Sequence, residues 1–243
     1  MSVRILHGDC IDVMRTLDAD TFDVCITDPP YNVGKDYGGH DDEVPIHEYV
    51  EWLGARLGQA FRVSRLGIVY FPGKRWALRS SEVLAVAGID PDSAALLGWH
   101  KTEFAGDKFK QRGPAQCWEP IVWAPKGNAE SNDVYGTIGR DFLVVKSHRQ
   151  ETTPLKALHP CPKPTEVMSW LVGLFCPPGG HVLDPFGGSG TTGLVAQRLG
   201  RSATLIELNP AYVKIAEARI RGDAPLFSAV VASRDGGSEA LTT

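Results

Sequence analysis

A tetrapeptide of one acid, two prolines and one aromatic residue follows a short apolar run at residues 22–27. It reads Asp28-Pro29-Pro30-Tyr31. An amine on an aromatic base is a weak nucleophile, and two acceptors aimed at its hydrogens favour the pyramidal, reactive form. Asp28 could supply one acceptor, the Pro29 carbonyl the other, and Tyr31 could stack on the base. Considered alone, the tetrapeptide could equally be a turn.

A glycine-rich loop follows a second strand-like run at residues 181–183. Such a loop lets the backbone approach a ligand, and the helix it opens offers free N–H groups. No lysine follows in the spacing of a phosphate-binding loop, and the GxGxxG spacing of dinucleotide folds is missing. The alternative is a tight strand–helix turn without a ligand. The candidate residues are Asp184, Pro185, Phe186, Gly187, Gly188, Ser189, Gly190, Thr191 and Thr192.

Three further side chains could join these two segments. Glu207 closes the strand-like run ATLIE, and a carboxylate there can accept both hydroxyls of a ribose. Asp9 follows the first strand-like run and could face a ligand, although a helix cap is as good an explanation. Lys163 lies among prolines and could approach a cofactor, although such a segment is more typical of a rigid crossover.

Basic residues gather in the middle of the chain. The formal charge of the protein is −4, which argues against a non-specific polyanion binder. Residues 99–163 nevertheless carry a net charge of +3. Their basic side chains could contact phosphates, or they could simply form a solvated surface. The candidates are Lys101, Lys108, Lys110, Arg112, Arg140, Lys146, Arg149 and Lys156.

The composition favours a cytoplasmic protein in a reducing compartment. The five cysteines are dispersed without a CxxC pair, so neither a disulfide framework nor a metal site is expected. The sequence begins without a signal peptide, and no apolar run approaches the length of a membrane span.

Strand-like and helix-like segments alternate, which predicts an α/β fold with a mostly parallel sheet and helices on both faces. Residues 130–158 are irregular, and a disordered tail is expected from residue 222. Strands are predicted over 3–6, 22–27, 67–71, 94–99, 120–123, 181–183 and 203–207, and helices over 11–17, 46–63, 76–87, 166–175, 191–199 and 210–221.

These motifs and their order resemble the amino-group DNA methyltransferases that use S-adenosylmethionine (SAM), in the permuted order called the beta group. The tetrapeptide precedes the glycine loop, whereas related RNA and glutamine methyltransferases usually place the loop first and carry Asn before Pro-Pro-Tyr. The matching segments are GDCIDVM (8–14), CITDPPYNVG (25–34), HKTEF (100–104), CWEPIVWAPKG (117–127), HPCPKP (159–164), VLDPFGGSGTT (182–192) and IELNPAYVKIAEARI (206–220).

The resemblance implies a doubly wound, Rossmann-like and circularly permuted methyltransferase domain over residues 1–221. It also implies a small recognition insert at about 128–158 and a tail at 222–243. The glycine loop would hold the methionine part of SAM, Glu207 its ribose and Asp9 its adenine amine. Asp28 and Pro29 would bind the target amine, and Tyr31 would stack on a base flipped out of duplex DNA. No metal is required.

The implied reaction is methylation of the N6 amine of adenine in double-stranded DNA, because Asp at the first tetrapeptide position is more usual for adenine enzymes. Cytosine-N4 methylation, an RNA or protein substrate, and an inactive DNA-binding decoy stay open as alternatives. The short insert predicts a short recognition sequence or a homodimer. The sequence leaves a restriction endonuclease partner undetermined.

Overall fold

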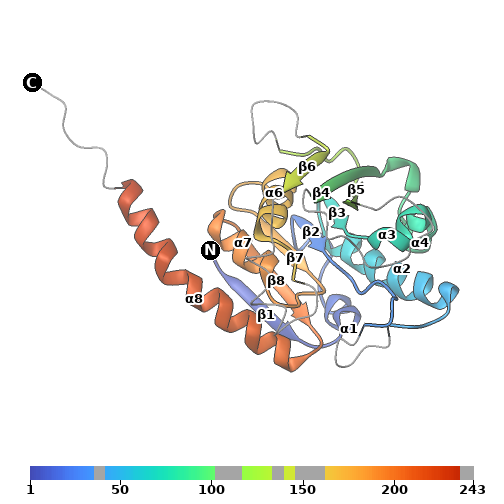
Figure 1. Ribbon diagram of the computed structural model, residues 1–243, viewed down its shortest axis with the longest axis horizontal. Coiled ribbons are helices and arrows are strands. Elements are labelled where there is room, and N and C mark those ends of the chain that lie inside the picture. Colours follow the sequence, from blue (N-terminus) through green and yellow to red (C-terminus); the bar gives the residue numbers. More distant parts are fainter. Residues whose placement is uncertain (36–41, 102–116, 133–139, 146–161, 236–243) are drawn as a thin grey trace, which may run out of the picture.

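Eight strands form one sheet in the computed structural model, which describes residues 1–35, 42–101, 117–132, 140–145 and 162–235 (Figure 1). The strand order is β1-β8-β7-β2-β3-β5-β4-β6. All neighbours pair in parallel except the two pairs that include β5. The predicted α/β fold with a mostly parallel sheet is therefore confirmed.

The bounds of the elements agree closely with the apolar periodicity of the sequence. The strands are β1 Val3–His7, β2 Val24–Thr27, β3 Gly67–Tyr70, β4 Ala95–Lys101, β5 Trp118–Pro125, β6 Phe142–Val145, β7 His181–Asp184 and β8 Ser202–Glu207. The helices are α1 Cys10–Arg15, α2 Ile46–Val63, α3 Gly73–Trp76, α4 Ser80–Val86, α6 Thr165–Phe175, α7 Thr191–Arg198 and α8 Pro210–Asp235, with 3₁₀ turns at Ala77–Arg79 and Pro91–Ser93.

Helices cover both faces of the sheet. In Figure 1, α6, α7 and α8 lie on one side, and α1, α2, α3 and α4 lie on the other. Successive side chains of β2 point to opposite faces, so Val24 and Ile26 join the hydrophobic core under α6 and α7, while Cys25 joins the core under α2. A strand buried on both faces reads as a continuous apolar run, as β2 does.

The strand order reverses between the parallel neighbours β2 and β7. From β2 the chain continues to its neighbour β3, whereas from β7 it continues to β8 on the other side. In open α/β sheets, ligands bind outside the carboxyl ends of the strands at such a reversal. The antiparallel strand β5 also begins at this edge, because it runs against its neighbours. Residues from β2, β7 and the start of β5 therefore share one edge.

One predicted helix is interrupted. Where a helix was expected over 76–87, the structure has the last residue of α3, then a 3₁₀ turn at Ala77–Arg79 and then α4. Trp76 anchors the break: its indole N–H donates to the Tyr31 carbonyl oxygen at 2.5 Å, and its ring packs 4.2 Å from that of Tyr49. This tertiary contact overrides the local helical pattern.

One strand was not predicted. β6 lies within 130–158, which was expected to be irregular, and pairs in parallel with β4 at the edge of the sheet. Phe142 and Val144 are half-exposed there, so the segment lacks the fully apolar pattern of an inner strand. Part of the expected recognition insert is thus a strand of the main sheet.

The last helix is longer than its predicted bounds. The last helix was predicted to end at residue 221, but α8 continues to Asp235 and runs past the body of the molecule (Figure 1). At the start of this extension, Asp223 pairs with Arg198 of α7 at 2.6 Å. Residues 236–243 lie outside the described part of the chain.

Candidate active site

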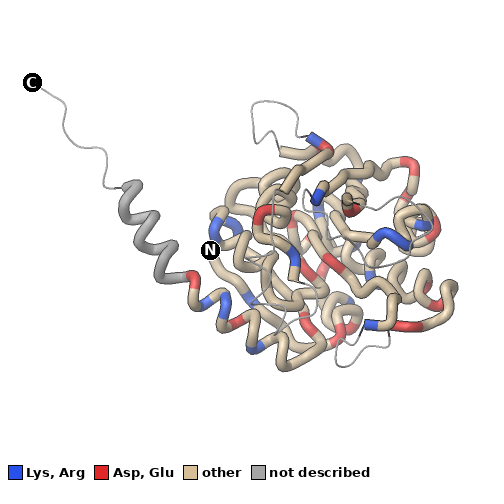
Figure 2. Tube along the Cα trace, in the orientation of Figure 1, with Lys and Arg blue, Asp and Glu red and all other residues tan. Residues whose placement is uncertain are grey.

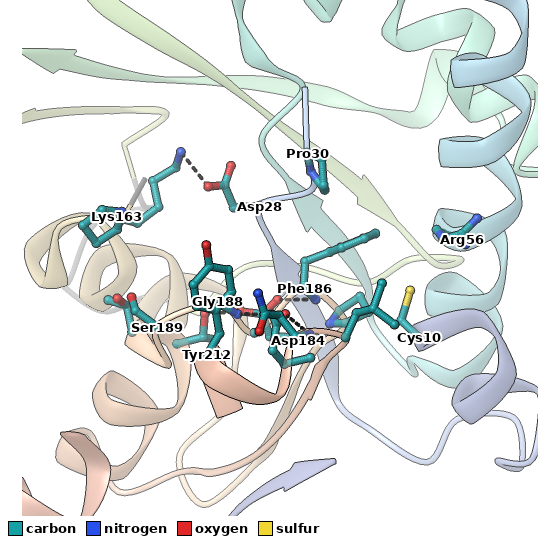
Figure 3. A pocket seen from close by; sticks show the side chains of 18 of the residues that line it. Cys10, Asp28, Pro30, Arg56, Lys163, Asp184, Phe186, Gly188, Ser189 and Tyr212 are labelled. Atoms are coloured by element: carbon teal, nitrogen blue, oxygen red, sulfur yellow. Dashed lines mark hydrogen bonds and ion pairs between the residues drawn. The ribbon is translucent and has the colours of Figure 1, made fainter. Parts of the chain in front are cut away.

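A cavity of about 250 Å³ opens at the carboxyl edge of the sheet, where β2 and β7 end (Figure 3). The tetrapeptide contributes Asp28 and Pro30 to its wall. The loop after β7 contributes all the predicted residues except Gly190, namely Asp184, Pro185, Phe186, Gly187, Gly188, Ser189, Thr191 and Thr192. Asp9, Lys163 and Glu207 also line this cavity, so the two predicted strand-end sites form one pocket.

Asp184 fastens three elements together from the end of β7. Its carboxylate accepts hydrogen bonds from the hydroxyl of Thr27 on β2 at 2.7 Å, the hydroxyl of Thr192 on α7 at 2.5 Å and the Phe186 backbone N–H at 3.1 Å. Burial raises the pKa of Asp184 to about 6, although these three donors oppose the shift. Asp184 therefore sets the shape of the loop and positions β2 against β7.

Glu207 closes the loop from the neighbouring strand β8. One carboxylate oxygen accepts from the Gly188 backbone N–H at 2.7 Å, and the other accepts from the Asn209 N–H at 2.8 Å. Burial raises the pKa of Glu207, against the effect of these backbone donors. Because each oxygen has two acceptor positions, Glu207 can still accept further hydrogen bonds from a ligand.

The turn into α7 depends on a glycine. Gly190 has φ +79°, in the left-handed region, and a Cβ there would lie 2.8 Å from the Cβ of Ala216 on α8. Arg219 of α8 supports the same turn, donating to the Ser189 carbonyl at 3.1 Å and the Thr191 hydroxyl at 2.8 Å. Gly190 therefore shapes the loop from outside the cavity wall.

Helix α2 supplies a wall that sequence reasoning missed. Trp52 packs 5.7 Å from the ring of Phe186, and the Arg56 guanidinium lies 4.3 Å from the centre of the Trp52 ring. Trp52 and Arg56 both line the cavity. The sequence predicts only a helix over 46–63, and the tertiary fold reveals that this helix forms a wall of the cavity.

Asp9 is held by two protein partners. It caps α1 by accepting from the Ile11 backbone N–H at 3.0 Å, and it pairs with Arg56 at 3.1 Å. The helix-cap explanation is therefore confirmed. Asp9 also lines the cavity, so the cap does not remove it from the site.

Asp28 and Lys163 form an ion pair at the other end of the cavity, with 2.8 Å between the carboxylate oxygen and the ammonium nitrogen (Figure 3). The second Asp28 oxygen accepts from the Tyr31 hydroxyl, which in turn accepts from Lys163 at 2.9 Å. Burial raises the pKa of Asp28, while Lys163 and Tyr31 act in the opposite direction. Lys163 was predicted to approach a cofactor, and it does line the cavity. Its direct contact with the tetrapeptide was not predicted.

The backbone of the tetrapeptide is fixed from behind. The Pro30 carbonyl accepts from the Tyr49 hydroxyl at 2.7 Å, and the Tyr31 ring packs against Gly73, where a Cβ would approach it to 2.9 Å. Pro29 is buried and, like Tyr31, lies outside the cavity lining. The tetrapeptide is thus rigid before any ligand arrives, as the two prolines predict.

Only two of the eight basic candidates fall within the described residues. Lys101, at the end of β4, pairs with Glu119 and lies 4.6 Å from the centre of the Trp99 ring. Arg140 is exposed just before β6. The others lie outside the described residues: Lys108, Lys110, Arg112, Lys146, Arg149 and Lys156. None of the described helices is long and apolar enough to cross a membrane.

The chain is similar to known proteins over most of its length. A family model described as DNA methylase matches residues 22–218. The DNA adenine methyltransferase YhdJ of Escherichia coli (strain K12) is 24% identical over 249 residues, covering 89% of this chain and 82% of that protein.

Two solved structures share the fold. The M1.HpyAVI–SAM complex has a TM-score of 0.64 and 24% identity, covering 90% of this chain and 99% of that one. The cytosine-N4-specific PvuII DNA methyltransferase has a TM-score of 0.71 and 17% identity, covering 94% and 92%. Because the family model spans most of the sequence, the chain belongs to the DNA methylase family and is a DNA methyltransferase of the exocyclic-amine class, N6 or N4.

Proposed function

We propose that this protein transfers a methyl group from SAM to the N6 amine of adenine in duplex DNA. One observation carries the proposal: Asp28, at the first position of the tetrapeptide, lines the same cavity as the glycine loop. An amine acceptor and a cofactor loop that share one cavity can bring a nucleophile and a methyl donor together. The solved M1.HpyAVI–SAM complex, which has the same fold, supports the choice of donor.

The charges and rings of the cavity fit SAM. Four carboxylates line it, from Asp9, Asp28, Asp184 and Glu207, against the two cations of Arg56 and Lys163. The lining is acidic on balance, which favours a ligand with a positively charged sulfur. Glu207 has acceptor positions for ribose hydroxyls. When bound, SAM supplies a methyl group already activated by its sulfonium. The aromatic wall beside Phe186 suits the adenine ring.

The tetrapeptide residues prepare the target amine. Asp28 accepts one N–H of the amine and the Pro29 carbonyl accepts the other, which directs the nitrogen lone pair toward the methyl donor. The ring of Tyr31, held against Gly73, offers a face for the flipped base. Since Asp28 lies in the wall of the cavity, the base must leave the duplex to reach it, at a cost of a few kcal/mol.

Identification of the methylated base tests this proposal. The purified protein is incubated with SAM and either unmethylated DNA or RNA. The nucleic acid is then digested to nucleosides, which are separated and identified by mass spectrometry. N6-methyladenine is expected. Asp28→Asn, which keeps the size of the side chain but removes its charge, should lower the yield by about 10²-fold or more. N4-methylcytosine alone would move the protein to the cytosine branch, represented by the PvuII enzyme, and RNA-only transfer would refute a DNA substrate.

A further inference from the structure

Lys163 occupies a cage of two acids and two aromatic rings beside the proposed target site. Its ammonium nitrogen lies 2.8 Å from Asp28 and 3.6 Å from Glu119. It also lies 4.7 Å from the centre of the Phe71 ring and 5.3 Å from that of Tyr31. The side chain is only 11% exposed. The ammonium group of a lysine so enclosed is stabilised by the neighbouring acids and rings rather than by hydration.

The fold places these groups together from distant segments. Lys163 stands between Pro162 and Pro164, immediately before α6, which limits its backbone freedom. Glu119 reaches the same edge because β5 is antiparallel and begins where the parallel strands end. Lys101, at the end of β4, pairs with Glu119 from the other side. The charges therefore alternate along the edge from Asp28 to Lys101.

Each group changes the ease with which Asp28 ionises. Burial raises the pKa of Asp28, Lys163 and the Tyr31 hydroxyl lower it, and the negative charge of Glu119 raises it. Asp184 on β7 is a further acid that interacts with Asp28. Burial also works against ionisation of Glu119, yet Lys163 and Lys101 hold the pKa of Glu119 below its ordinary value. Glu119 is therefore an anion near neutral pH.

We propose that Lys163 is a positioning residue that keeps Asp28 ionised and oriented for the target amine, and that Glu119 balances the charge of Lys163. This inference rests on the proposed function, in which Asp28 must be an anion to accept an N–H. Lys163 acts through Asp28 and does not touch the reacting atoms. Glu119 limits how strongly the ammonium attracts Asp28.

Two substitutions in this cluster should shift the pH profile of kcat/KM in opposite directions. In Lys163→Met the buried carboxylate loses its cation, so the acid limb should move to higher pH by about one unit or more. The rate lost at neutral pH should then return as the pH rises. In Glu119→Gln the neighbouring anion is lost, so the acid limb should move to lower pH.

Lys163→Arg and Lys214→Met are the matched controls. Arginine keeps the positive charge at position 163, so it should restore most of the wild-type pH profile. Lys214 is exposed on α8, and its substitution should leave the profile unchanged. A defect in folding or packing would instead lower kcat/KM equally at every pH. Such a uniform loss in Lys163→Met would overturn the inference.

A measurement without turnover separates this inference from the proposed function. Carboxyl ¹³C NMR of aspartate-labelled protein, with the Asp28 signal assigned through Asp28→Asn, follows the ionisation of Asp28 directly. The pH at the midpoint of the Asp28 titration should be higher in Lys163→Met than in the wild type. An unchanged midpoint would refute the role of Lys163, even if the protein methylates adenine. A shifted midpoint in a protein that methylates no DNA would refute the proposed function alone.

Discussion

The carboxylates that line this pocket have different roles, which depend on their hydrogen-bond partners. Asp184 and Glu207 accept bonds from the protein that shape the glycine loop. Asp28 instead pairs with the ammonium group of Lys163 and accepts a hydrogen bond from the hydroxyl of Tyr31. The sequence predicted all three acids at strand ends, because an acid after an apolar run is visible in sequence. The bond of Thr27 to Asp184 and the pairing of Lys163 with Asp28 were not predictable, because each joins segments that are distant in the sequence. Glu119, which lies near Lys163, is equally distant.

The titration of Asp184 predicts a pH effect on stability. Its pKa in the folded protein is about 6, against an ordinary value of 3.8, so the folded state binds the proton more tightly than the unfolded chain. The contribution of Asp184 to stability is present below about pH 4 and is lost as the pH rises through about 6, by about 3 kcal/mol. Asp184→Asn removes this titration.

Urea denaturation between pH 4 and 7 measures this difference. The free energy of unfolding should fall less steeply with rising pH in Asp184→Asn than in the wild type. Asp18→Asn, at an exposed position, is the control and should follow the wild-type curve. Parallel curves for the wild type and Asp184→Asn would show that Asp184 is not the titrating group.

At the scale of elements, sequence periodicity predicted the bounds of a helix or strand best where its apolar side chains pack on the hydrophobic core. The amphipathic helix expected over 46–63 has the bounds Ile46–Val63 in the structure. Prediction failed where a contact from elsewhere decides the local structure. Trp76 interrupts a helix through its bond to the Tyr31 carbonyl. The edge strand β6 has one exposed side, so its pattern resembles a loop.

The junction between α7 and α8 gives a prediction at this scale. Gly190→Ala would destabilise the protein in two ways. Alanine disfavours the left-handed backbone with φ +79°, and its added methyl group would clash with Ala216. Gly88 is the matched control, because its φ is +72° while nothing lies within 4 Å of an added Cβ. Gly88→Ala should lose about 1–2 kcal/mol from backbone strain alone.

Gly190→Ala should lose a further 1–3 kcal/mol or so, since the added methyl overfills the contact between α7 and α8. Urea denaturation of both variants measures these losses, and the difference between them isolates the helix contact. Equal losses would mean that α8 can move away from α7 without cost.

At the scale of the whole molecule, the fold explains why residues 156 positions apart in sequence share a site. β2 and β7 are parallel neighbours in the sheet, and the strand order reverses between them, so both end at the same edge. Figure 2 shows acidic and basic residues interspersed along the described backbone. The basic candidates for DNA contact fall mostly in segments outside the described residues, so the sequence and the fold together define the catalytic edge better than the DNA-binding face.

The central claim is that one cavity holds the methyl donor against the amine acceptor of the tetrapeptide. A crystal structure with bound SAM tests it most directly. The ribose should lie on Glu207, the adenine beside Phe186 and Trp52, and the methyl group should face Asp28. SAM bound elsewhere, or bound here with its methyl group directed away from Asp28, would contradict the account.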